Sequence, residues 1–203
     1  FHLKKGALFH NGKIIRAGDF KFSWERVLRI NAPYAYLFAN IQGSDEVLAG
    51  EETVASGITA VNDYTLQVHL KRPQYNFVEM LTHPTSAVLD RYEVVEQGVN
   101  FGKPGTLKTP AYIPIGSGPY SLIEWIDGRS LTLGENPEYF GEKPLIPRLE
   151  FTWAELTEDA VIDFLGGRIH LLQDVTFQDL SGLTVEHSEL PLVEKPALRF
   201  RYV

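Results

Sequence analysis

The chain contains no cysteine among its 203 residues. Disulfide bonds, cysteine-ligated zinc and thiol catalysis are therefore excluded together. No apolar run approaches the roughly 20 residues that a membrane-spanning helix needs, so no such helix is expected. Positive charge is scarce, because 19 Lys and Arg stand against 26 Asp and Glu and give a formal charge of −7. Nucleic-acid binders concentrate Lys and Arg on one face, so neither DNA nor RNA is an expected partner.

Residue patterns for catalysis or metal binding are also sparse. The 6 histidines never fall three or four residues apart, the spacing that places two ligands on one helix face. The segment Gly116-Ser117-Gly118 lacks the lysine of a phosphate-binding loop. Asp159 and Asp163 share one face of an expected helix, and a carboxylate-dependent hydrolase is the alternative of a different class. We expect no catalytic residue, no metal site and no cofactor.

The chain has enough hydrophobic residues, 44% of the total, to bury a sizeable core. The patterns predict a mixed α and β organisation. Hairpin turns are expected at Asn11-Gly12, Asn62-Asp63 and Asp127-Gly128. A helix is expected over residues 20–28, where apolar residues recur on one face, and Asp90 is expected to cap another that ends at Gly98. Further helices are predicted over 35–42, 45–49, 77–81 and 158–165, and strands over 58–61, 65–70, 87–89, 120–125, 131–133, 148–153, 169–171 and 198–203.

The most informative segment runs from Ile115 to Trp125 and reads IGSGPYSLIEW. With LTL at 131–133 and NPEYFG at 136–141, it resembles the signature GTGPYKL-x-EW…L-x-x-NPDYWG. Residues 1–12 (FHLKKGALFHNG), 17–26 (AGDFKFSWER) and 54–66 (VASGITAVNDYTL) match three more signatures in the same order. The chain thus resembles the family 5 extracellular solute-binding proteins, which are the oligopeptide-, dipeptide- and nickel-binding components of ABC importers.

This resemblance implies an α+β (mixed α/β) fold of the type II periplasmic-binding-protein kind, present as an internal fragment. Residues 1–110 would belong to a subdomain inserted into the large lobe, lobe I. Residues 111–203 would form an incomplete part of that lobe, with the irregular segment 100–114 at the boundary. Family members close two lobes around a ligand by a hinge motion. We therefore expect the fragment alone to bind peptide weakly or not at all, because it supplies one wall of the cleft.

The implied function is that of a substrate-binding receptor for an ABC importer, with peptides as cargo held partly by main-chain hydrogen bonds. The implied partners are a peptide or other small solute and the membrane permease of the importer. The implied location is the periplasm or the cell surface, with a lipid anchor left open, and the implied state is a monomer. Nickel chelate, haem or an oligosaccharide are alternative cargoes on the same fold.

Tyr34 and Tyr36 are the candidate ligand-binding residues. They lie in APYAYLF, which resembles the family segment SPYASYLQY, and in peptide-binding relatives a tyrosine from this region approaches the ligand. Packing in the core is the alternative for each of them. Trp24, Trp125 and Trp153 are predicted to be core residues, because each lies in an element with matching apolar periodicity.

Overall fold

The computed structural model describes residues 1–98, 101, 115–153 and 157–173. The chain divides into two compact units, Phe1–Phe151 and Thr152–Val203, and each is described by itself. The boundary expected near residue 110 concerns the lobes of a larger protein and stays a prediction. The described elements are α1 (Ala17–Arg29), η1 (Ala35–Phe38), α2 (Ser44–Leu48), β1 (Ile58–Asn62), β2 (Thr65–Val68), α3 (Phe77–Met80), η2 (Pro84–Ser86), α4 (Arg91–Gln97), β3 (Tyr120–Ile126), β4 (Ser130–Glu135), β5 (Arg148–Thr152) and α5 (Thr157–Leu165).

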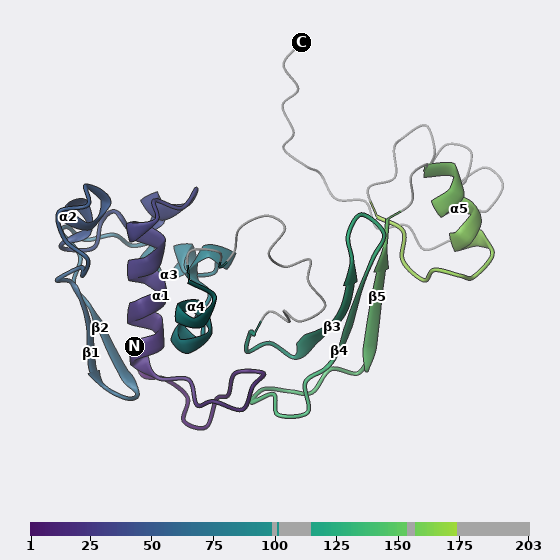
Figure 1. Cartoon of the computed structure of the whole chain (residues 1–203), viewed down its shortest axis with the longest axis horizontal. Coiled ribbons are helices and arrows are strands. Elements are labelled where there is room, and N and C mark those ends of the chain that lie inside the picture. Colours follow the sequence, from purple (N-terminus) through teal and green to yellow (C-terminus); the bar gives the residue numbers. More distant parts are fainter. Residues whose placement is uncertain (99–100, 102–114, 154–156, 174–203) are drawn as a thin grey trace, which may run out of the picture. The chain divides into compact units, whose positions relative to one another are not determined.

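Helix α1 is the centre of the main core. Its first turn is capped, because the Arg16 amide donates to the Asp19 carboxylate at 2.8 Å. On its apolar face Trp24 and Leu28 are buried, and they share a cluster with Ile58 of β1 and Leu66 of β2. The helix therefore packs against the β1–β2 hairpin, beside which it lies in Figure 1.

The β1–β2 hairpin is antiparallel, with Thr59 opposite Gln67. The first residues of the chain run beside it, since the Leu66 amide donates to the Phe1 carbonyl at 3.0 Å. The Leu3 amide likewise donates to the Tyr64 carbonyl at 2.8 Å. The start of the chain is thus tied to a segment more than sixty residues away, and this contact helps to close the core around α1.

Strands β3, β4 and β5 form a sheet in that order (Figure 1). The predicted turn at Asp127-Gly128 joins β3 to β4, and Gly128 has φ +68°, a left-handed angle that glycine adopts without steric cost. After β4, the Asn136 amide donates to the Pro119 carbonyl at 2.7 Å. The IGSGPYSLIEW and NPEYFG motifs are therefore held together at this end of the sheet.

Several predicted elements differ from the structure. The helix expected over 35–42 stops at Phe38, because residues 40–42 pair instead with 69–71, as in the bridge between Ile41 and Leu70. The strands expected over 87–89 and 169–171 are wrong, since neither segment is a strand in the structure. The strand expected over 198–203 lies outside the described residues.

The three tryptophans also differ from one another. Trp24 is a core residue, as predicted, with 3% of its surface exposed. Trp125 is only half-buried. Trp153 is 53% exposed, so its prediction is wrong. It follows the last residue of β5, and periodicity within a strand says little about a residue past its end.

Candidate functional site

Tyr34 and Tyr36 lie together on the surface at the start of η1. Tyr36 is 64% exposed and Tyr34 is 44% exposed, and their ring centroids lie 6.1 Å apart at an interplanar angle of 48°. Neither side chain is part of the core, so the packing alternative does not hold for either. Two neighbouring exposed rings offer an amphipathic surface, apolar on the ring faces and hydrogen-bonding at the hydroxyls.

The residues beside the tyrosines explain why their rings face outward. Ala35 and Phe38 are buried, with 3% and 0% exposure, and Phe38 packs on Trp24 with ring centroids 5.4 Å apart. In a tight helical turn the face that holds these two residues is turned toward the core. Tyr34 and Tyr36 are therefore placed on the other side by an anchored turn.

His83 completes the group, which we call the aromatic cluster: Tyr34, Tyr36 and His83. Its ring centroid lies 4.2 Å from that of Tyr34. The imidazole is fixed, because its Nδ1 accepts a hydrogen bond from the Thr85 amide at 3.2 Å at the start of η2. Sequence reasoning missed His83, since an isolated histidine carries no spacing signal. Its proximity to Tyr34 arises only from folding.

The far end of η1 is held by side chains from two other segments. The Ala39 carbonyl, just after η1, accepts hydrogen bonds from Lys71 Nζ and from Ser44 Oγ, each at 2.7 Å. A lysine here also complements the negative end of the turn. The cluster therefore sits on a segment that is tied down at both ends.

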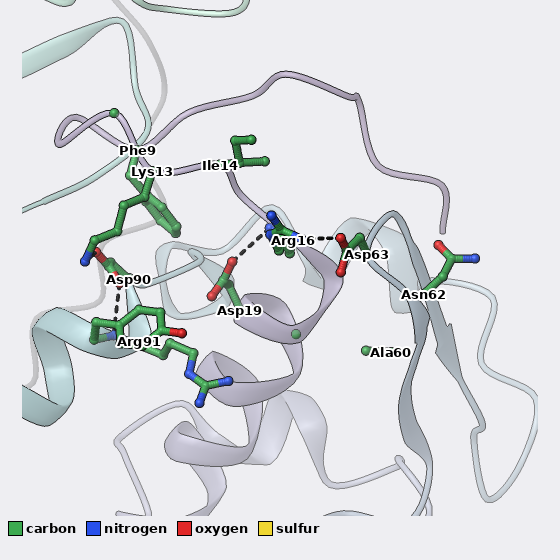
Figure 2. A pocket seen from close by; sticks show the side chains of 13 residues that line it. Phe9, Lys13, Ile14, Arg16, Asp19, Ala60, Asn62, Asp63, Asp90 and Arg91 are labelled. Atoms are coloured by element: carbon green, nitrogen blue, oxygen red, sulfur yellow. Dashed lines mark hydrogen bonds and ion pairs between the residues drawn. The ribbon is translucent and has the colours of Figure 1, made fainter.

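A hollow of about 780 Å³ lies between the residue 9–16 segment, the turn of the β1–β2 hairpin and the starts of α1 and α4 (Figure 2). Its charged side chains largely pair with one another. Lys13 Nζ lies 2.8 Å from the Asp90 carboxylate, and Arg16 pairs with Asp63. No sequence pattern pointed to this hollow, because its lining comes from four separate segments.

The pKa values of two carboxylates in this hollow are shifted in opposite directions. Burial raises the pKa of Asp19, and the hydrogen bond from the Arg16 amide only partly opposes it. Burial also acts to raise the pKa of Asp90. There, however, hydrogen bonds from Lys13, Asn11 and the Tyr92 amide outweigh burial and lower the pKa below its ordinary value. Asp90 is therefore held as a carboxylate by its partners.

Asp159 and Asp163, the carboxylates of the hydrolase alternative, lie on α5. They do share a face of this helix, but Asp163 accepts a hydrogen bond from Arg168 Nε at 2.6 Å. Across residues 1–98, 101, 115–153 and 157–173 no group of three or more His, Asp and Glu side chains gathers as a metal site. Nor do these residues include a helix both long and apolar enough to cross a membrane.

Comparison with known proteins gives a consistent result. The profile of the bacterial extracellular solute-binding proteins, family 5 (middle region), matches residues 1–203. The periplasmic oligopeptide-binding protein OppA of Escherichia coli K12 is 32% identical over 145 residues, which cover 69% of this chain and 25% of that protein.

Solved structures agree in fold. Haemophilus influenzae OppA, in complex with the peptide RPPGFSPFR, superimposes with a TM-score of 0.77 at 25% identity, over 92% of this chain and 36% of that one. NikZ of Campylobacter jejuni, in complex with Ni(L-His), superimposes with a TM-score of 0.64 at 22% identity, over 83% of this chain and 30% of that one. The chain thus spans about a quarter to a third of the length of these proteins.

Proposed function

Because the chain belongs to the bacterial extracellular solute-binding proteins of family 5, we propose that it is part of the peptide-binding component of an ABC importer. Members of this family are substrate-binding proteins with the type II periplasmic-binding-protein fold. Such a component works outside the cytoplasm, in the periplasm or at the cell surface, and delivers peptides as a monomer to a membrane permease. It binds by closing a hinged cleft around the ligand and carries out no covalent chemistry.

The observation that carries this proposal is the aromatic cluster. Tyr34 and Tyr36 are exposed, yet the turn that bears them is anchored through Phe38 in the core. Rings held in this way lose little conformational entropy when a ligand packs on them. They can stack on side chains or cover the main chain of a peptide without requiring one sequence. We infer that Tyr34 and Tyr36 contact the peptide and that His83 supports the ring of Tyr34.

The test is calorimetric titration of a mixture of short peptides into the longer protein that carries this chain. Tyr34→Ala and Tyr36→Ala should each weaken binding about tenfold, since an aromatic contact contributes about 0.5–1.5 kcal/mol beyond its buried area. The loss should come without a change in thermal stability, because both side chains are exposed.

Tyr75→Ala is the matched control. Tyr75 is 99% exposed and lies outside the aromatic cluster, so its removal should leave peptide affinity unchanged. Unchanged affinity in both cluster variants would contradict the assignment of Tyr34 and Tyr36. Failure of the unaltered longer protein to bind peptide, while it binds a nickel chelate, haem or an oligosaccharide, would contradict the peptide cargo itself.

A further inference from the structure

His10 makes three hydrogen bonds to a segment more than 100 residues away. Its amide donates to the Gly116 carbonyl at 2.8 Å. Its ring Nδ1 accepts from the Gly116 amide at 3.2 Å, and its Nε2 lies 3.1 Å from the Gly118 carbonyl oxygen. The approach is close, since a Cβ at Gly116 would lie 3.3 Å from the ring carbon Cε1.

These partners fix the protonation state of the ring. A backbone amide can only donate, so Nδ1 must present its lone pair to Gly116. A carbonyl oxygen can only accept, so Nε2 must carry the proton. The bonded form of His10 is therefore the neutral imidazole with its proton on Nε2. A second proton on Nδ1 would remove the acceptor, and the Nδ1–H group and the Gly116 N–H group would then repel each other.

The turn that carries His10 also binds α4. Asn11 Nδ2 and Lys13 Nζ donate to the Asp90 carboxylate at 2.7 and 2.8 Å. Asp90, which lies beside Lys13 in Figure 2, also caps that helix. On the other side, the Gly118 carbonyl accepts a second hydrogen bond, from Asn136 Nδ2 at 3.0 Å. The Asn11-Gly12 turn thus joins the start of α4 to the segment that leads into β3.

We propose that His10 is a pH-sensitive latch: the neutral ring ties residues 116–118 to the N-terminal turn, and protonation of the ring on acidification breaks its bond with the Gly116 amide and loosens this tie. A histidine is suited to this role because its charge changes within the range that surroundings outside the cytoplasm reach. The latch does not depend on which solute the protein binds, although its use in the cell rests on the proposed location outside the cytoplasm.

The segments packed around the latch carry several charged groups, most of which have partners of their own. Phe9 and its neighbours pack against Phe20 of α1, Val88, Ile115 and Phe140. Lys13 pairs with Asp90, Asp19 accepts the Arg16 amide, and Lys4 Nζ donates to the Phe140 carbonyl. Glu138 lies two residues after Asn136 on the remaining segment, and its amide donates to Asn136 Oδ1 at 3.0 Å. Among the described residues, both ring nitrogens of His10 bond only to backbone atoms.

Nitrogen-15 NMR of the longer protein that carries this chain tests the latch directly. At pH 7.5 the ring shifts of His10 should identify the form protonated on Nε2 alone. Between pH 7.5 and 5.5 the hydrogen-exchange protection of the Gly116 amide should fall about tenfold relative to the Leu28 amide in α1, the effect of one lost hydrogen bond. The Lys13–Asp90 pair should persist, because Asp90 remains ionised over this range.

His10→Phe and His69→Phe form the matched pair of variants. His10→Phe should hold Gly116 at low protection at both pH values, whereas His69→Phe, which alters an exposed ring, should keep the wild-type pH response. A proton on Nδ1 of His10 at pH 7.5 would overturn the proposal, as would Gly116 protection that does not change with pH in the wild-type chain. Both of these readings come from the unaltered protein, so they stand even if His10→Phe does not fold.

Discussion

At the scale of single residues, Gly57 shows how closely two segments can approach when a side chain is absent. Its amide donates to the Gln42 carbonyl at 2.8 Å, and its carbonyl accepts from the His69 amide at 2.8 Å. A Cβ at this position would lie 2.6 Å from the His69 carbonyl oxygen and 2.8 Å from the Gln42 nitrogen. These are backbone atoms, so they cannot swing aside as a flexible side chain would.

We therefore expect Gly57→Ala to lower the free energy of unfolding by about 1–3 kcal/mol, as overpacking usually does. Urea denaturation measures the change. Gly18→Ala is the control, because a Cβ at Gly18 meets nothing within 4 Å. This residue lies in α1, where alanine favours the helix by up to about 1 kcal/mol relative to glycine. The control should be neutral or stabilising. Equal losses in the two variants would show that the close approach at Gly57 is unimportant.

Residue roles were predictable from sequence where the signal was local. The cap formed by Asp90 followed from its own position and is confirmed. The exposure of Tyr34 and Tyr36 could not be read from the chain, since it depends on which side of a tight turn meets the core. His83 and the bonds of His10 depend on partners brought close by folding, and no spacing rule points to them.

At the scale of elements, the Asp90 carboxylate joins the Asn11-Gly12 turn to α4. Its lowered pKa means that the ionised form is favoured in the folded state. The stabilisation is therefore complete above the ordinary pKa of an aspartate, near pH 4, and is lost as the pH falls through the lower folded value.

We expect Asp90→Ala to lower the free energy of unfolding by about 1–3 kcal/mol at pH 7, because three donors lose their acceptor and α4 loses its cap. The gap between wild type and variant should narrow as the pH falls below 4. Asp63→Ala removes the exposed pair with Arg16 and should change stability by less than about 1 kcal/mol. Denaturation curves at pH 7 and pH 3 measure both, and a gap independent of pH would contradict the assigned role.

Elements were predictable when turn chemistry and periodicity agreed, as at Asp127-Gly128 between β3 and β4. They were not predictable when tertiary pairing overrode local preference. Residues 40–42 are predicted as the end of a helix but pair with 69–71, and η1 ends at Phe38. Residues 87–89 have strand-like composition but no ladder partner in the described part of the chain, and a strand needs one.

At the scale of the whole molecule, the mixed α/β fold and the family were both predictable. Four motifs in order predicted the family, and the profile match over residues 1–203 confirms it. The cargo was not predictable, because the same fold holds a peptide in one relative and Ni(L-His) in another. The matched residues make up 25% of E. coli OppA.

The most direct test of the account is a calorimetric titration of mixed di- to pentapeptides into the longer protein and, side by side, into the 203-residue chain. The account predicts micromolar or tighter binding to the longer protein and weak or undetectable binding to the chain alone, because one wall of a cleft cannot enclose a ligand. No binding to the longer protein would contradict a peptide receptor. Micromolar binding to the isolated chain would contradict a site that needs a second lobe.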